Sequence, residues 1–407
     1  MKLNTYLLLL FSVILLACNS EKKSAEEFTL TWEEVQAVPA SFGDISKGVS
    51  AAFVGILDDN LVVAGGCNFP DVPAAEGGKK IFYKDILMLD DFGWKKLGEL
   101  PEAIAYGVSI TYDDKLIFVG GQNDNLLSTV YVLEFEDDVL KLDTLPSLPF
   151  TFDNGAGCLH ENKIVIFGGN QNGIAVSDVW SLDLENPDSW QKESTLPIEG
   201  GLVQPILVSQ SRVFSKNTKE VLGGEIYVSK SMPQLFAFGG FSPAVDGRSA
   251  QVNQAVWSFN HQSLAWEKVA EGVNPNEERN SFSGGVGIAV EDSLILLLGG
   301  VNQQIFEEAL NRNLYLSKAD ENATDTVTQK YRKEAAEYMY HPAEWYRFND
   351  EVWLYNTNSD SWKLLGKYPQ AALAGASIVA DDNVIYVVNG ELKPGIRTPK
   401  IWKIVLE

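Results

Sequence analysis

The chain has 407 residues, of which 45% are hydrophobic, 11% aromatic and 21% charged, a composition typical of a globular fold with a large core. Its formal net charge of −23 argues against nucleic acid as a partner and against broad contact with an anionic membrane surface. An anionic ligand would therefore need a local positive group.

Residues 1–18 are expected to form a lipoprotein export signal, which takes no part in the fold. Lys2 precedes an apolar run from Tyr6 to Leu16, which is too short to span a bilayer as a mature helix. The run ends in Leu15-Leu16-Ala17-Cys18, which resembles the lipobox of bacterial lipoproteins, whose cysteine is lipidated. The alternative is a plain secretory signal with an incidental cysteine. We expect lipidation at Cys18, a tether over 19–27, and an exported protein anchored to a membrane of a bacterial envelope.

From residue 48 onward the sequence repeats. Each copy begins with a strand rich in Gly, Ala and Ser, continues through a tight polar turn such as Asp58-Asp59-Asn60, and returns along an apolar strand that ends in a glycine pair. A sixth, degenerate copy ends in Asn389-Gly390. Successive glycine pairs are about 50 residues or more apart, a spacing typical of kelch repeats with loops of variable length. The first glycines of the five regular pairs are Gly65, Gly120, Gly168, Gly239 and Gly299.

Each copy continues with an apolar third strand, such as 85–89, and a fourth strand that often begins at a tryptophan. In the second copy Leu140 takes the tryptophan position. Small residues suit strands that crowd around an axis, and large rings fill the widening space further out. The pattern predicts an all-β, six-bladed kelch-type β-propeller over residues 28–407. The tryptophans are Trp94, Trp190, Trp266 and Trp362.

The sixth copy lacks a fourth strand, because the chain stops after Ile401–Val405. The segment Phe28–Val35, with Trp32 at the tryptophan position, can supply it. We expect residues 28–36 to complete the last blade, so that the N-terminal strand closes the ring and removes its exposed edges.

In a propeller, the loops after the second and fourth strands share one face. The longest of these loops, residues 301–350, contains two segments that predict helices, 307–310 and 330–338. We expect a helical insertion at 302–350 in blade 5. Long loops on one end of a rigid scaffold favour a binding face, although tolerated length variation is the alternative.

The loop after the sixth pair brings opposite charges close together. Glu391 follows the strand directly, and Arg397 comes six residues later, across the turn Pro394-Gly395. A carboxylate beside a guanidinium suits acid–base chemistry next to anion recognition. A structural salt bridge explains the spacing equally well.

The remaining cysteines and the histidines predict no metal site and no cofactor. Cys67 and Cys158 fall in different repeats, which favours two buried free thiols over a disulfide. His160, His261 and His341 are scattered, which disfavours a copper oxidase built on a kelch propeller.

The segment Val388–Thr398 closely resembles a loop of the N-acetylneuraminate epimerases, also called sialic acid mutarotases. Residues 299–306 and 105–109 are also similar to that family, and the likeness covers most of residues 46–407. The blade order resembles a circular permutation of the enterobacterial members. The resemblance implies interconversion of the α- and β-anomers of N-acetylneuraminate, with Glu391 as the acid–base residue and Arg397 as the carboxylate binder.

We expect ring opening of the sugar without a metal or nucleotide, with water or Tyr106 as the partner of Glu391. Asn302 and Gln303 are candidates for binding sugar hydroxyls, although Asn302 is equally suited to capping a helix. The departures from the family are Gln122, the loop 69–79 and an extra stretch near 211–230, and they leave the sugar preference open. A mutarotase for another sugar and a non-catalytic propeller that binds protein or glycan are the alternatives. The sequence leaves the oligomeric state open.

Overall fold

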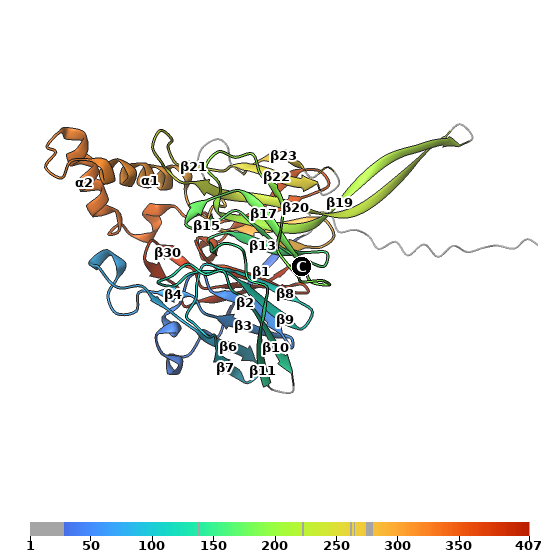
Figure 1. Ribbon diagram of the computed structural model, residues 1–407, viewed down its shortest axis with the longest axis horizontal. Helices are drawn as coiled ribbons and strands as arrows, with labels where there is room; N and C mark the ends of the chain where they lie inside the picture. The colour runs from blue at the N-terminus through green and yellow to red at the C-terminus, as the bar shows by residue number, and fades with distance from the viewer. Residues whose placement is uncertain are drawn as a thin grey trace, which may run out of the picture.

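The computed structural model describes residues 28–136, 139–221, 224–260, 263, 265–273 and 280–406, with only the backbone considered over 215–228. This part of the chain is an all-β fold of antiparallel strands with few helices (Figure 1). The export signal, Cys18 and the tether lie outside the described residues.

Six sheets contain four main strands each, and in five of them the strands follow one another along the chain. Their orders are β2 (Phe53–Leu57), β3 (Asn60–Ala64), β6 (Asp85–Asp90), β7 (Gly93–Glu99); β8 (Val108–Tyr112), β9 (Lys115–Val119), β10 (Val130–Glu136), β11 (Val139–Leu145); β13 (Ala156–His160), β14 (Lys163–Phe167), β17 (Asp178–Asp183), β18 (Gln191–Thr195); β19 (Val203–Val221), β20 (Gly224–Ser242), β22 (Ala255–Asn260), β23 (Ala265–Glu271); and β24 (Val286–Val290), β25 (Leu294–Leu298), β26 (Glu351–Asn356), β27 (Ser361–Lys367).

The sixth sheet joins the two ends of the described chain. It runs β28 (Ser377–Asp381), β29 (Val384–Val388), β32 (Ile401–Leu406) and β1 (Leu30–Val35). β1 pairs antiparallel with β32 along its whole length, and Trp32 lies opposite Ile404. The predicted pairing of the N-terminal strand with the last copy is therefore confirmed.

At or just before the start of the first strand of each sheet, one residue adopts a positive φ, from 52° at Asn154 and Gln204 to 71° at Gly284. The backbone N–H of each of these six residues donates to the carbonyl of the previous one, at 2.8–3.2 Å, and the series returns to its start. We call these residues the axial cycle, and all six line one cavity of about 210 Å³. They are Ala51, Tyr106, Asn154, Gln204, Gly284 and Gly375.

The glycine pairs are explained by contacts between neighbouring sheets. The second glycine donates its N–H to a carbonyl of the next sheet, as Gly169 does to Leu202 at 2.7 Å. The first glycine has a positive φ, and a Cβ on Gly168 would lie 2.6 Å from that same Leu202 oxygen. Glycine alone therefore allows this close backbone approach. In the sixth sheet Gly390 donates in the same way to Val49, and Asn389 takes the positive φ of 54°.

The outer strands are joined by large side chains, as the repeat predicted. The indole of Trp94 donates to the Gln36 carbonyl at 2.8 Å, just beyond β1 of the neighbouring sheet. Leu140 lies opposite Phe135 in β11, the register position that Trp94 occupies opposite Leu89. The core consists of apolar clusters between adjacent sheets, such as the stacked rings of Phe53 and Phe118.

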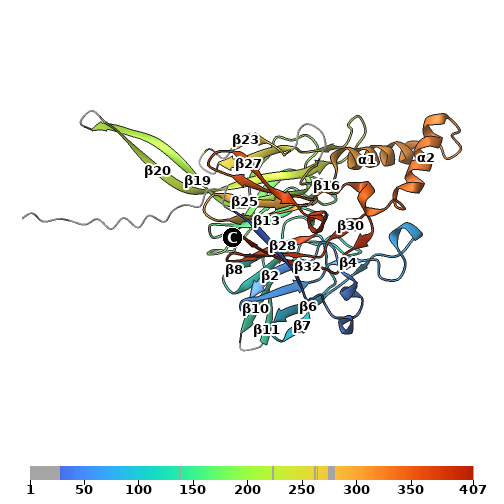
Figure 2. The same ribbon diagram turned by 180° about the vertical axis from the view of Figure 1, so that it is seen from behind.

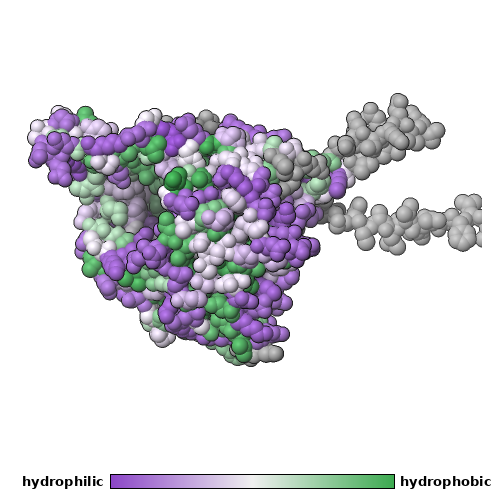
Figure 3. Space-filling model, viewed as in Figure 1, coloured by the Kyte–Doolittle hydropathy of each residue, from purple (hydrophilic) through white to green (hydrophobic). Residues whose placement is uncertain are grey.

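The two ends of the molecule differ (Figures 1 and 2). The long β19–β20 hairpin projects from one end. The other end carries α1 (Gln303–Lys318) and α2 (Thr326–Tyr338), which lie between β25 and β26. Both predicted helical segments of the insertion fall inside these helices. Figure 3 shows a hollow below the projecting helices.

The same end as the helices carries small strands and short 3-10 helices. The small strands are β4 (Cys67–Asn68), β5 (Ile81–Phe82), β12 (Phe152–Asp153), β15 (Asn170–Gln171), β16 (Ile174–Ala175), β21 (Gln251–Val252), β30 (Glu391–Lys393) and β31 (Ile396–Arg397). The 3-10 helices are η1 (Ala40–Lys47), η2 (Ala74–Glu76), η3 (Ala343–Tyr346) and η4 (Pro369–Ala371).

Both described cysteines are free thiols, as predicted. The expectation that both are buried was wrong for Cys158, which is only partly buried because it lies on the first strand of its sheet, beside the axial space. Within the described residues, no helix combines the length and apolarity needed to cross a bilayer.

Candidate functional site

The β30–β31 hairpin carries the charged residues that the sequence singled out. Glu391 and Arg397 are cross-strand partners, so their side chains leave the same face of the hairpin. Gly395 makes the turn with a φ of 83° and packs against Ala74 of the neighbouring loop. Glu391 also forms a backbone bridge with Ala374, which directly precedes the axial cycle.

The two charges form an ion pair in which the carboxylate is more accessible than the guanidinium. Arg397 Nη2 lies 2.6 Å from Glu391 Oε1, and the exposed fractions of their side chains are 3% and 23%. Arg397 Nη1 is buried and has no hydrogen-bond partner. A buried donor without a partner costs free energy, so an added acceptor would recover that cost.

Two further residues complete this pair. The hydroxyl of Ser50 accepts from Arg397 Nε at 3.1 Å and donates to Glu391 Oε1 at 3.4 Å. The ring of Phe69 stacks on the guanidinium, with its centroid 4.9 Å from Cζ. We call Glu391, Arg397, Ser50 and Phe69 the charged corner.

Burial raises the pKa of Glu391 above its ordinary value, and the positive charges of Arg397 and Lys80 oppose that rise. A hydrogen bond from Ser50 also lowers it. A carboxyl whose pKa lies closer to neutrality is better matched to exchanging protons at physiological pH. The structure therefore places a carboxyl with a raised pKa next to the Arg397 cation.

Tyr106, a member of the axial cycle, is linked to the charged corner through Cys67. Its hydroxyl accepts from Lys80 Nζ at 2.9 Å and from Cys67 Sγ at 3.2 Å. Cys67 Sγ in turn lies 3.8 Å from the Ser50 hydroxyl. The structure thus connects Tyr106 to Glu391 through a short chain of side chains.

Asn302 and Gln303 lie at the start of α1. Asn302 is buried and accepts the Ile305 N–H at 3.2 Å, so it caps the helix, the alternative that the sequence left open. Gln303 donates to Glu307 at 3.0 Å and accepts from Gln254 at 3.3 Å. These contacts attach α1 to the neighbouring sheet, and none of those that Gln303 makes within the described chain reaches Glu391.

Sequence reasoning missed Ser50, Phe69 and Lys80. Ser50 lies in the small-residue strand start that the repeat identified, but its spacing gives no sign of the partner 341 residues away. Phe69 and Lys80 belong to the loop between β4 and β5. The available signal was the position of this loop, directly after the first glycine pair.

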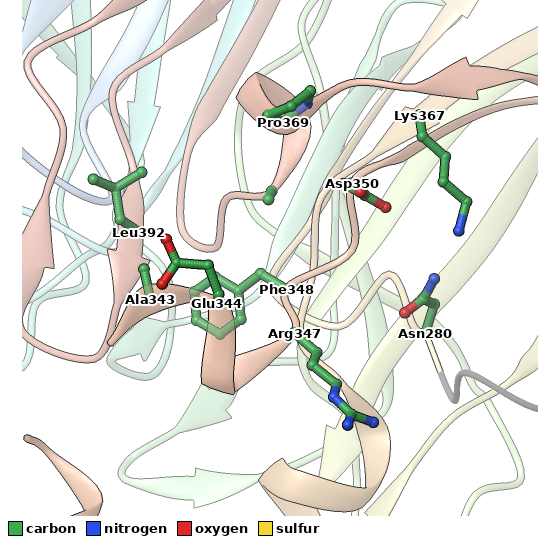
Figure 4. A pocket seen from close by; sticks show the side chains of 10 residues that line it. Asn280, Ala343, Glu344, Arg347, Phe348, Asp350, Lys367, Pro369 and Leu392 are labelled. Atoms are coloured by element: carbon green, nitrogen blue, oxygen red, sulfur yellow. The ribbon is translucent and has the colours of Figure 1, made fainter. Parts of the chain in front are cut away.

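A second hollow of about 640 Å³ lies beyond the hairpin, between η3, η4 and β27 (Figure 4). Leu392 reaches it, because successive side chains of a strand point to opposite faces, away from Glu391. Arg347, Lys367 and Glu344 give it a mixed charge. Among the described residues, no group of three or more His, Cys, Asp or Glu could hold a metal ion.

The arrangement defines a class of protein: an all-β scaffold of repeated four-stranded sheets with one charged corner on one face. The family model for N-acetylneuraminate epimerase matches residues 15–142 and 145–407. The chain therefore belongs to the N-acetylneuraminate epimerase family.

Curated relatives named N-acetylneuraminate epimerase agree with this result. The one from Salmonella paratyphi B is 28% identical over 261 residues, which are 64% of this chain and 58% of the relative. The one from Yersinia pestis is 28% identical over 264 residues, covering 64% and 57%. The chain thus spans less than two thirds of their length. A solved structure titled "Structure of YjhT" matches 64% of each chain at 24% identity, with a TM-score of 0.47.

Proposed function

We propose that the protein is a sialic acid mutarotase that interconverts the α- and β-anomers of N-acetylneuraminate. The observation that carries the proposal is the ion pair of Glu391 and Arg397, with a partly exposed carboxylate and a buried guanidinium. Family membership and the names of the relatives support the substrate.

We infer that the six sheets are blades of a kelch-type propeller and that the helices are an insertion in its fifth blade. The axial cycle supports this inference, because its hydrogen bonds run through one residue of every sheet and return to Ala51. Contacts between the first strands of neighbouring sheets support it too, since they also form a closed series. Residues 28–407 then form one domain. The charged corner lies beside the mouth of its ring.

Glu391 is the acid–base residue of the proposed reaction. Its carboxylate takes the proton of the anomeric hydroxyl, the bond between the anomeric carbon and the ring oxygen breaks, and the ring oxygen gains a proton. The open keto form rotates and recloses by the reverse steps. The chemistry forms no covalent intermediate with the protein.

Arg397 binds the sugar carboxylate. In the structure its Nε and Nη2 contact Ser50 and Glu391, and Nη1 is left for an added acceptor. Because Phe69 covers the guanidinium, the ring has to shift when a carboxylate enters. Binding then places the anomeric centre, which carries the carboxylate, next to Glu391. Asn302 and Gln303 remain weaker candidates for sugar hydroxyls.

The proposal is tested by following the anomers directly. Sialidase releases the α-anomer, and proton NMR records its conversion to the β-anomer with and without the protein. We expect wild-type protein to accelerate conversion and Glu391→Gln to lose about 10²–10⁴-fold of the acceleration, the usual contribution of a general acid–base group.

Glu267→Gln, which changes an exposed carboxylate on β23, is the matched control and should retain full activity. Unchanged rates in Glu391→Gln would remove this residue from the mechanism. A wild-type protein that accelerates no sugar would favour a non-catalytic propeller. Acceleration of a different sugar would retain the mechanism and change the substrate.

We also propose that the protein is exported and lipidated at Cys18, which would keep it on a membrane of the envelope. The apolar run and the lipobox-like end of residues 1–18 support this proposal. Expression with a labelled fatty acid should label the wild type and leave Cys18→Ser unlabelled. Equal labelling of both would contradict it.

A further inference from the structure

The hydroxyl of Tyr106 occupies an unusual hydrogen-bonding position. A tyrosine hydroxyl has one hydrogen to donate and two lone pairs to accept with. Lys80 donates to this oxygen and has no lone pair to accept with, while the Cys67 thiol, 3.2 Å away, is a weak partner that also lies 3.8 Å from the Ser50 carbonyl. Within the described chain, the Cys67 sulfur is thus the only acceptor that the structure places at the Tyr106 O–H.

The backbone of Tyr106 lies beside the axial cavity. Tyr106 has a φ of 66°, a conformation that is costly for a residue other than glycine. Its N–H donates to Ala51 and its carbonyl accepts from Asn154, as part of the axial cycle. Tyr106 also lines the cavity of about 210 Å³. The backbone of Tyr106 is therefore fixed at the edge of open space, and its hydroxyl is held by Lys80 and Cys67.

Lys80 lies where it can act on this hydroxyl. Its Nζ is 4.9 Å from the centroid of the Tyr106 ring and 6.0 Å from that of Phe69. Lys80 directly precedes β5, in which Ile81 pairs with Asn68 and Phe82 with Cys67 of β4. The described residues give Lys80 no carboxylate within ion-pair distance, so its charge is directed at the tyrosine and, more distantly, at Glu391.

Burial raises the pKa of Tyr106, with a further rise from Cys67. The phenol consequently stays protonated near neutral pH and is suited to donating a proton rather than accepting one. An adjacent ammonium stabilises the phenolate that donation leaves behind, because opposite charges attract strongly at a poorly solvated site.

We propose that Tyr106 is the second proton-transfer group of the site and that Lys80 is the positioning residue that orients its hydroxyl. This inference rests on the proposed mutarotase activity. During ring opening Glu391 takes the proton of the anomeric hydroxyl, the electron pair left on that hydroxyl oxygen forms the keto group, and the ring oxygen leaves with the bonding pair and takes the Tyr106 proton. On reclosure the ring hydroxyl returns its proton to the phenolate, and the keto oxygen takes one from Glu391.

The test combines single and double variants in the NMR anomer-exchange assay at pH 8. Tyr106→Phe keeps the ring and should lower kcat about 10²-fold with little change in KM, as expected when a general acid is removed. Tyr112→Phe, on the neighbouring strand β8, is its matched control and should keep wild-type kcat. Thermal unfolding of each variant should match the wild type to within a few degrees.

Lys80→Met should lower kcat in the wild-type background but add little in the Tyr106→Phe background, because Lys80 acts through the hydroxyl. Lys80→Arg should restore most of the activity, and Lys79→Met, the exposed neighbour, should have no effect. Full activity in Tyr106→Phe would overturn the proposal. So would a Lys80→Met variant that raises KM equally in both backgrounds, since Lys80 would then bind the sugar carboxylate itself. An inactive wild type overturns both the mutarotase proposal and the proposal for Tyr106. If the wild type is active, the variants test the role of Tyr106 alone.

Discussion

The six sheets end their second strands in the same way, yet among the described residues only one of the positions after these strands carries an ion pair. After the glycine pair, the chain continues with a neutral residue in five sheets and with Glu391 in the sixth. Glu391 and Cys67 form equivalent backbone bridges, to Ala374 and Ser50. The backbone geometry thus recurs in the repeats, whereas the charged side chain occurs only at Glu391 among these six positions. The five neutral residues are Cys67, Gln122, Asn170, Phe241 and Val301.

The ion pair of Glu391 and Arg397 also has partners from the neighbouring sheet. Ser50, Phe69 and Lys80 all come from the first copy, and Arg397 and Glu391 come from the last. The site therefore forms at the junction of the two ends of the repeat array, where β2 and β28 lie side by side. A single repeat could not build it.

The strongest test of this comparison is Arg397→Met. Loss of the guanidinium removes the proposed partner of the sugar carboxylate, and hydrogen bonds to charged groups contribute about 1.5–3 kcal/mol, so KM for a sugar acid should rise roughly 10- to 100-fold. KM for an uncharged analogue should change much less. Arg347→Met, at the second hollow, is the control. An equal effect of both changes would place sugar binding outside the charged corner.

Substitution in a glycine pair of another sheet should change the stability of the protein and not its catalysis. Gly168→Ala forces a side chain into a left-handed conformation, which costs about 1–2 kcal/mol, and into contact with Leu202, so the unfolding free energy should fall by more than about 2 kcal/mol. Gly173→Ala has a similar φ of 78° but no atom closer than 3.7 Å, and should lose only the conformational part. Denaturant unfolding measures both. Equal losses would show that the close approach has little weight.

The attachment of the β30–β31 hairpin to the segment after α2 should have a smaller effect. Lys393 Nζ donates to the carbonyl oxygens of His341 and Met339, at 2.7 and 3.2 Å. Lys393→Met should loosen β30 and lower kcat/KM about fivefold, because part of a charged hydrogen-bond contribution is lost. Tyr340→Phe removes a bond to Ala75 from an exposed side chain, and should have less effect. A larger effect from Tyr340 would reverse this order.

The smallest expected effect is a shift of the acidic limb of the pH profile. In the proposed reaction Glu391 acts as a base only when ionised, so activity should fall as the pH drops through its pKa. A hydrogen bond from Ser50 lowers that pKa, so Ser50→Ala should raise it and move the loss of activity to higher pH. Ser46→Ala, in the exposed η1 segment, is the control. A shift to lower pH would contradict the assigned role of Ser50.

The repeat was predictable from sequence because close packing restricts its residues directly. A Cβ on Gly168 would clash with the Leu202 carbonyl, and the Trp94 indole packs against the neighbouring sheet. The same residue types therefore recur at these positions of the repeat. The pairing of β1 with β32 followed from a missing strand at one end and a spare strand at the other. The helices of the insertion followed from their apolar and charged patterning.

The chemistry around the charged pair was only half predictable. Glu391 and Arg397 share one short hairpin, so local spacing reveals them. Ser50, Phe69 and Lys80 reach them only after the first and last sheets meet, and no local pattern encodes that meeting. The long β19–β20 hairpin was visible only as extra length in the fourth copy, because an extended hairpin carries no positional constraint from the axis.

The central claim is that a sugar acid binds at the charged corner, and a crystal structure of the protein with N-acetylneuraminate tests it most directly. We predict that the sugar carboxylate contacts Arg397 and that the anomeric oxygen lies within hydrogen-bond distance of Glu391. A sugar bound in the hollow beyond Leu392, or one whose anomeric carbon lies away from Glu391, would contradict the account.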